Sequence, residues 1–211
     1  MVGSAAFAAV LMGQSGCPTT GTYHFRAVDA EDDFAYTPIA YSGGSVLVAT
    51  DFRLDEVSSS GGIELGLFRN NQSGNDAFHL IVGLDGGGKH FTLGAEGMGE
   101  VRQNFDYQLG NWYRATMIYS EASATASLVV EDLSSGAVVT SVAVSGGAIA
   151  QDLTRFGVAK QGGDGIGHGV GEIDNVRVVG TDGVLLEVDF GVDPGFVTTD
   201  PTDFYWNASG E

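Results

Sequence analysis

The ten residues Gly110-Asn111-Trp112-Tyr113-Arg114-Ala115-Thr116-Met117-Ile118-Tyr119 carry the pattern that decides the fold class. Alternate positions after the Gly-Asn-Trp opening are apolar: Tyr113, Ala115, Met117 and Tyr119. A period of two is typical of a strand that buries one face. Large rings in such a strand bury much area, so we interpret Trp112 and Tyr119 as core residues.

Similar short apolar runs recur along the chain: 46–54, 63–67, 78–82, 126–130, 138–144, 156–159, 172–179 and 184–190. Turns such as Ser134-Ser135-Gly136 and Gly180-Thr181-Asp182-Gly183 separate them, and the chain holds 33 glycines but four prolines. From Tyr23 onward no segment has the period of a helix. Short strands joined by glycine-rich turns predict an all-β, antiparallel β-sandwich, formed as one domain by residues 21–211.

Acidic residues dominate the charge, with 27 Asp and Glu against 9 Lys and Arg, which gives a formal charge of −18. Such a chain repels phosphate groups, so nucleic acid and anionic membranes are excluded as expected partners. The acidic surface indicates either a solubilising role in a saline or extracellular setting, or carboxylates that hold calcium.

Residues 1–20 begin with an apolar stretch that is too short to span a bilayer as a helix. The stretch has the length of a secretory signal core but lacks the usual basic start, and Gly16-Cys17 resembles the end of a lipoprotein signal although Gln14 departs from that pattern. A degenerate export signal and a plain apolar start both stay open. We expect an extracellular or cell-surface protein without a transmembrane segment. Cys17 is the only cysteine, which excludes a disulfide framework and leaves its lipidation open.

The segments Gly110–Tyr119, Ser127–Gly136 and Glu172–Val178 resemble the laminin-G-like branch of the concanavalin A-like lectin/glucanase superfamily. The resemblance covers roughly residues 21 to 211. It implies a jelly roll of two curved antiparallel sheets, as found in secreted bacterial proteins that bind or process polysaccharides.

The end of the chain, Asp189–Glu211, resembles the opening segment of such modules, and Gly21–Arg26 resembles what would follow it. We therefore expect residues 184–211 to supply a displaced opening strand. That strand could complete its own domain in a circularly permuted fold, or pair with the next module or the next molecule. An unpaired apolar strand would promote association, so one of these pairings is expected.

Glu172-Ile173-Asp174 resembles the start of the Glu-x-Asp-x-(x)-Glu strand of laminarinase-type hydrolases, in which the last Glu is the acid/base. Here Val176 and Arg177 occupy the positions where that Glu would stand. Without the proton donor, double displacement fails, so catalysis is not expected.

Asp174 resembles instead the closing-strand Asp that holds a structural calcium in several β-sandwich carbohydrate-binding modules, with Asp189 as its matching acid. The alternative is that both are solvated acids. Asp29–Asp33 is interpreted as an exposed acidic turn and Gly162–Gly169 as a flexible loop. The four histidines lack the spacing of a metal site.

Sugar binding requires exposed aromatic rings beside polar side chains. Five aromatic residues are candidates: Tyr205, Trp206, Tyr36, Tyr41 and Tyr107. Adjacent strand residues point to opposite faces, so one of Tyr205 and Trp206 should point outward.

The sequence thus predicts a non-catalytic, secreted module that binds polysaccharide or glycan, or is an adhesive part of a larger surface protein. One alternative is a structural repeat or filament subunit that self-associates through the 184–211 strand. The other is a divergent polysaccharide hydrolase or lyase.

Overall fold

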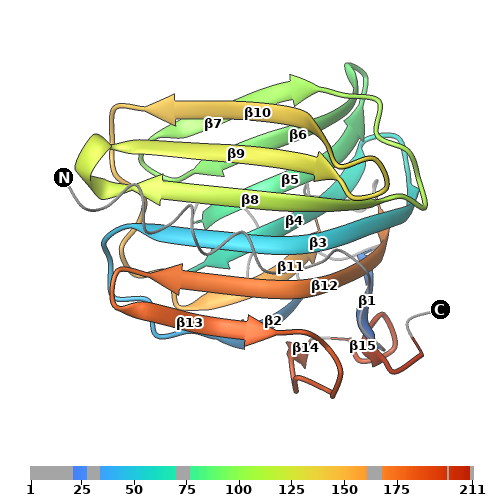
Figure 1. The fold of residues 1–211 in the computed structure, drawn as a ribbon. Coiled ribbons are helices and arrows are strands. Elements are labelled where there is room, and N and C mark those ends of the chain that lie inside the picture. The colour runs from blue at the N-terminus through green and yellow to red at the C-terminus, as the bar shows by residue number, and fades with distance from the viewer. Residues whose placement is uncertain (1–20, 28–33, 70–76, 161–167, 199, 210–211) are drawn as a thin grey trace.

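The computed structural model describes residues 21–27, 34–69, 77–160, 168–198 and 200–209. These residues form two antiparallel sheets packed face to face (Figure 1). The eight-stranded sheet comprises β1 (Thr22–Ala27), β3 (Val46–Val57), β8 (Trp112–Ser120), β9 (Thr125–Asp132), β10 (Ala137–Ser145), β12 (Gly169–Gly180), β13 (Gly183–Val188) and β15 (Phe204–Asn207). The seven-stranded sheet comprises β2 (Phe34–Pro38), β4 (Gly61–Phe68), β5 (Ala77–Asp85), β6 (Gly88–Ala95), β7 (Gly99–Asn104), β11 (Arg155–Lys160) and β14 (Val197–Thr198). The predicted all-β antiparallel sandwich is confirmed.

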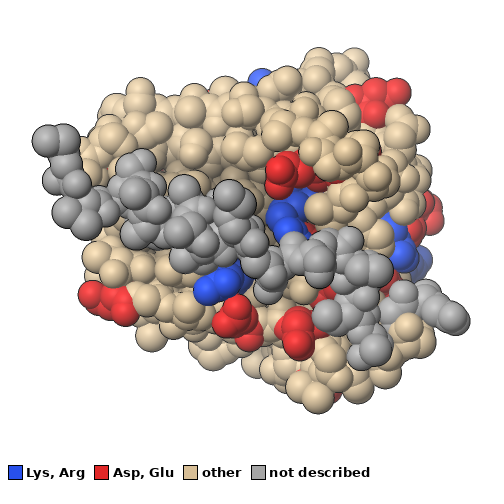
Figure 2. Space-filling view, viewed as in Figure 1, with Lys and Arg blue, Asp and Glu red and all other residues tan. Residues whose placement is uncertain are grey.

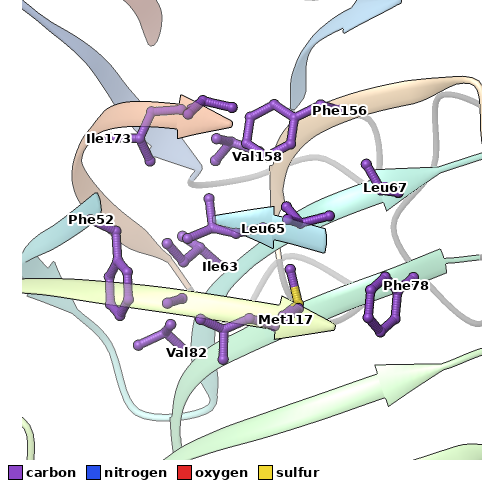
Figure 3. Packing of buried hydrophobic residues seen from close by; sticks show 14 of the residues in the cluster. Phe52, Ile63, Leu65, Leu67, Phe78, Val82, Met117, Phe156, Val158 and Ile173 are labelled. Carbon is purple, nitrogen blue, oxygen red and sulfur yellow. The ribbon is translucent and has the colours of Figure 1, made fainter. Parts of the chain in front are cut away.

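A single core fills the space between the sheets (Figure 3). From the eight-stranded sheet, Phe52, Met117 and Ile173 point inward, and from the other sheet Leu65 and Phe156 face them. All five side chains are at most 1% exposed. Each such side chain contributes roughly 1.5–3 kcal/mol through burial, so the alternation seen in the sequence is what holds the two layers together.

The strands of the eight-stranded sheet lie side by side in the order β10-β9-β8-β3-β12-β1-β15, and the eighth strand, β13, pairs with β12. One edge of β12 pairs with β3. The other edge is shared by two strands: β1 lies against Gly169–Ile173, and β13 lies against Val176–Gly180. Figure 1 shows β13 and β1 following one another along β12.

The C-terminal strands pair within this chain. β13 forms the predicted hairpin with β12, β14 pairs with β2, and β15 pairs with β1. Phe196 and Phe190 also pack on Tyr23 of β1, with ring centroids 4.8 and 6.0 Å away. The segment thus contributes to the same core as the rest of the chain, and a circular permutation relative to other modules stays a prediction.

The strand predicted over 184–190 is shorter than expected and ends at Val188. Phe190 has a left-handed φ of 54° and its side chain is fully buried. Its carbonyl oxygen accepts a hydrogen bond from Trp206 Nε1 at 2.8 Å. Because the chain turns inward there, it leaves the sheet two residues early.

Three predicted features lie wholly or largely outside the described residues: the 1–20 segment with Cys17, the acidic run 29–33 and the glycine-rich run 162–169. Helical structure in the described part is limited to the 3-10 turn η2 (Glu121–Ser123). None of the helical structure described has the length and apolar composition needed to cross a bilayer.

Candidate functional site

A row of five side chains crosses the outer face of the eight-stranded sheet. Trp112, Arg53, Glu172, His24 and Tyr205 are direct register partners on the neighbouring strands β8, β3, β12, β1 and β15. We call them the Trp112–Tyr205 row. Their neighbours one residue away, such as Phe52, Ile173 and Tyr23, point into the core. The period of two therefore places the whole row on the face of the sheet that points away from the core.

The row is held together by side-chain contacts. The Arg53 guanidinium lies 5.2 Å from the centre of the Trp112 ring, and its Nη2 is 3.3 Å from Glu172 Oε2. Arg53 also donates two hydrogen bonds to Asp55, at 2.8 and 3.1 Å. At the other end the His24 and Tyr205 rings have centroids 4.7 Å apart. These contacts fix the side chains before any ligand arrives.

Burial lowers the pKa of His24. The Glu172 carboxylate, which lies beside it on β12, acts in the opposite direction. Glu172 is itself buried, and its Oε1 accepts a hydrogen bond of 3.0 Å from Asn207 Nδ2. The middle of the row thus combines a fixed carboxylate with an imidazole whose charged form is disfavoured by desolvation.

A second row of polar side chains runs beside the first, through Arg114, Asp51 and Asp174 on β8, β3 and β12. Arg114 binds Asp51 through two hydrogen bonds of 2.6 and 2.8 Å, and these bonds raise the pKa of Arg114. A bulge between Asp174 and Arg177 gives Asn175 a left-handed φ of 50°. Asn175 Nδ2 donates to Asp51 at 3.0 Å and to Asp174 at 3.1 Å, so one amide fixes both carboxylates.

A hollow of about 250 Å³ opens where the two rows meet β8 and the turn after β9. Its lining combines one indole ring, two carboxylates, two small polar side chains, one leucine and one glycine: Asp51, Gly110, Asn111, Trp112, Leu133, Ser134 and Asp174. In Figure 2, viewed as in Figure 1, acidic and basic atoms adjoin one another in the right half of this face. An aromatic wall beside hydrogen-bonding groups can hold a ring that carries hydroxyls.

Of the predicted aromatic residues, Tyr205 is the one that lies in the Trp112–Tyr205 row, and it is 43% exposed. Trp206 points the other way, packs against the core and is half-buried. The expectation that one of the two adjacent rings faces outward is confirmed, with Tyr205 as the outward ring.

The expectation that Tyr41 and Tyr107 are exposed is wrong, because their rings are 6% and 1% exposed. Tyr41 donates to the Gly44 carbonyl at 2.7 Å, and Tyr107 donates to the Gly83 carbonyl at 3.1 Å. Both rings enter the core while their hydroxyls donate to backbone carbonyls, and the sequence around them has no alternation that indicates this burial. Tyr36 lies on the other sheet, half-buried between Phe34 and Arg155.

Trp112 was interpreted as a core residue, and this is also wrong. It is half-buried and lines the hollow. The missed signal is positional: Tyr113, Ala115 and Met117 face inward, so Trp112, one residue before Tyr113, must face outward.

The two predicted metal ligands are not direct partners in the sheet. Asp174 is buried on β12, where its Oδ1 accepts a hydrogen bond of 2.7 Å from the Asn175 backbone. Asp189 is exposed after β13, and its Oδ1 accepts a bond of 3.1 Å from the Gly191 backbone. Among the described residues, no group of three or more His, Cys, Asp or Glu side chains could hold a metal ion. The calcium site stays a prediction.

The carboxylates of Glu172-Ile173-Asp174 both face the outer surface. Val176 is buried in the core, and Arg177 lies 3.4 Å from Glu187 in an ion pair. Neither residue can replace the missing acid/base of the hydrolase strand, because neither carries a carboxyl group.

Comparison with known proteins shows that this chain is similar to solved structures in its fold. A scan against protein-family profiles finds no match, and a search of curated proteins finds no similar sequence. Among solved structures, a sialidase is similar over 76% of this chain and 15% of its own, with 16% identity and a TM-score of 0.50. Peanut lectin is similar over 80% of this chain and 95% of the lectin chain, with 14% identity and a TM-score of 0.47. Lectin II from Ulex europaeus is similar over 74% of this chain and 86% of the lectin chain, with 14% identity and a TM-score of 0.48.

The two antiparallel sheets and the likeness to the sialidase show a jelly-roll sandwich fold. The predicted jelly-roll fold is confirmed, whereas membership of the concanavalin A-like superfamily and of its laminin-G-like branch stays a prediction.

Proposed function

We propose that this protein is a non-catalytic carbohydrate-binding module whose binding site is the hollow beside Trp112. The observation that carries the proposal is the lining of the hollow, which brings together the indole ring of Trp112, the carboxylates of Asp51 and Asp174, and the polar side chains of Asn111 and Ser134. The indole face can cover the apolar face of a pyranose, while carboxylate and amide groups accept or donate hydrogen bonds to its hydroxyls.

The orientation of the two carboxylates supports binding. Arg114 and Asn175 hold Asp51, and Asn175 holds Asp174, so both carboxylates are kept in fixed orientations. A preorganised site loses less side-chain entropy on binding. The volume of about 250 Å³ is below the range of roughly 300–1,000 Å³ usual for drug-sized ligands and suits one sugar unit at this point.

The hydrolase alternative is disfavoured for a chemical reason. Glu172 is engaged by Arg53 and Asn207, and Asp174 by Asn175, so both carboxylates are held by donors. A retaining mechanism needs a protonated carboxyl group at the leaving oxygen, and the strand offers Val176 and Arg177 there.

Secretion, adhesion and calcium binding belong to the same proposal. The acidic composition supports an extracellular setting. A structural calcium at Asp174 and Asp189 would raise the melting temperature, because a ligand that binds only the native state stabilises it. An unchanged midpoint after chelation would remove calcium from the proposal without affecting the sugar site.

A glycan array tests the proposal directly. We expect the wild-type chain to bind a subset of the panel, and Trp112→Ala to lose that binding while its melting temperature shows that it is folded. Trp112→Phe, which keeps an aromatic face, should retain part of the binding. Silence of the wild-type chain across the array would contradict a sugar-binding role.

A further inference from the structure

The Trp112–Tyr205 row continues without a break from the hollow to the far edge of the sheet. We propose that the row is one extended binding surface and that its ligand is a neutral, linear glycan of several sugar units that runs across the strands. This inference rests on the proposed function and specifies the ligand class for the same site.

The length of the row indicates more than one sugar unit. Trp112 and Tyr205 are separated by four strand-to-strand steps, through β3, β12 and β1. With neighbouring strands ~4.8 Å apart, the row spans about 19 Å. A disaccharide in the hollow cannot reach Tyr205 across that distance, whereas a chain of several pyranose units can.

The two ends of the row are aromatic and its middle is polar. Trp112 borders the hollow, and Tyr205 is 43% exposed on the last strand, beside His24. Between them lie the guanidinium of Arg53 and the carboxylate of Glu172. Aromatic platforms at both ends would hold the ring faces of terminal units, while the partly exposed side chains of Arg53 and His24 would hydrogen-bond to hydroxyls of the units between them. The buried carboxylate of Glu172 would hold the Arg53 guanidinium in place.

The charge of the surface selects the kind of glycan. Each arginine of the two rows is paired: Arg53 with Asp55 and Glu172, and Arg114 with Asp51. Asp174 adds a further carboxylate, so these two guanidinium groups face four carboxylates. Together with the formal charge of −18, this balance disfavours uronate or sulfate groups and favours an uncharged chain.

Calorimetry with glycans of different length tests the inference. The probes are the disaccharides and hexasaccharides of β-1,3-glucan, β-1,4-glucan and β-1,4-mannan, with hexagalacturonate as the anionic probe. For the neutral series that the wild-type chain binds, we expect Tyr205→Ala to weaken hexasaccharide binding at least fivefold and to leave disaccharide binding unchanged. Tyr36→Ala, on the other sheet, is the matched control and should change neither.

The outcomes separate this inference from the proposed function. If Trp112→Ala abolishes binding but Tyr205→Ala leaves hexasaccharide affinity unchanged, the extended surface is wrong and the sugar site stands. If no probe binds the wild-type chain, the inference of a neutral linear glycan is wrong, while the glycan array decides on the sugar site itself. Hexagalacturonate binding as tight as that of the best neutral hexasaccharide would overturn the assignment to neutral glycans.

Discussion

Two acid–arginine pairs on this protein differ chiefly in burial. Asp51 and Arg114 are 3% and 13% exposed, whereas Asp85 and Arg102 are 40% and 35% exposed. Both pairs are bidentate. Solvent screens the exposed pair, while the buried pair leaves an uncompensated charge when one partner is removed.

We therefore expect Asp51→Asn to lower the free energy of unfolding by about 3 kcal/mol, because the Arg114 guanidinium would lose its carboxylate partner at a largely buried position. Denaturant unfolding monitored by fluorescence measures the change. Asp85→Asn is the matched control and should leave the midpoint nearly unchanged. Equal losses in the two variants would contradict the role assigned to burial.

His79 is a buried base on the outer side of β5. Its ring is 3% exposed and stacks on Phe68, and neither ring nitrogen has a hydrogen-bond partner in the described part of the chain. Burial lowers the pKa of His79 from 6.5 to about 4. In the unfolded chain the imidazole takes up a proton near pH 6.5, while in the native protein it stays neutral down to about pH 4.

Because the unfolded state then binds more protons, stability should fall as the pH drops from about 6.5 to about 4. The loss attributable to His79 is about 2–3 kcal/mol. Unfolding titrations at pH 7.5 and 4.5 measure it, and His79→Gln, which cannot be protonated, should show a loss smaller by that amount. The same pH dependence in both proteins would mean that His79 does not carry it.

At the scale of elements, β12 organises the eight-stranded sheet. It has β3 on one edge and both β1 and β13 on the other, and Asn175 at its bulge fixes the two carboxylates of the second polar row. Gly171 lies in β12 opposite Leu54 of β3. A Cβ there would collide with the Arg53 carbonyl oxygen and crowd the Phe25 ring.

Gly171→Ala should therefore destabilise the protein by about 1–3 kcal/mol, because backbone atoms of β3 would have to move. Gly86→Ala is the matched control, since a Cβ there would meet nothing within 4 Å. The thermal midpoints of the two variants measure the contrast. A Gly171→Ala variant as stable as the control would contradict the close approach of β3 and β12.

Strands with one apolar face could be predicted from the sequence, whereas the edge strands β7 and β14 could not. Tyr113, Ala115 and Met117 of β8 are all buried, as their alternation indicates. β7 contributes mainly Val101 to the core, so its pattern is nearly polar throughout. The short strand β14 pairs through two residues and has no pattern to read.

The polar rows were harder to predict for a different reason. Alternation indicates that Arg53 and Asp51 share one face of β3, but it does not reveal which strands lie beside β3. Trp112, Glu172 and Tyr205 are brought to Arg53 by the order of five strands that are scattered through the sequence. The bulge at Asn175 also shifts the register of β12, which alternation alone cannot show.

For the whole molecule, the pairing of the C-terminal strands predicts the state of assembly. β13, β14 and β15 each pair with a strand of the same chain, so no strand partner is needed from another molecule. We expect light scattering to give the mass of a monomer, 21.9 kDa, over a wide range of concentration. Polymers that grow with concentration would favour strand exchange instead.

The central claim for the whole molecule is that the outer face of the eight-stranded sheet binds sugar through Trp112. The most direct measurement is the affinity of a neutral hexasaccharide, chosen from the array, for the wild-type chain, Trp112→Ala and Tyr36→Ala. We predict at least a tenfold loss, about 1.4 kcal/mol, for Trp112→Ala and no change for Tyr36→Ala, which lies on the opposite sheet. Full affinity in Trp112→Ala, or loss of binding in Tyr36→Ala alone, would contradict the account.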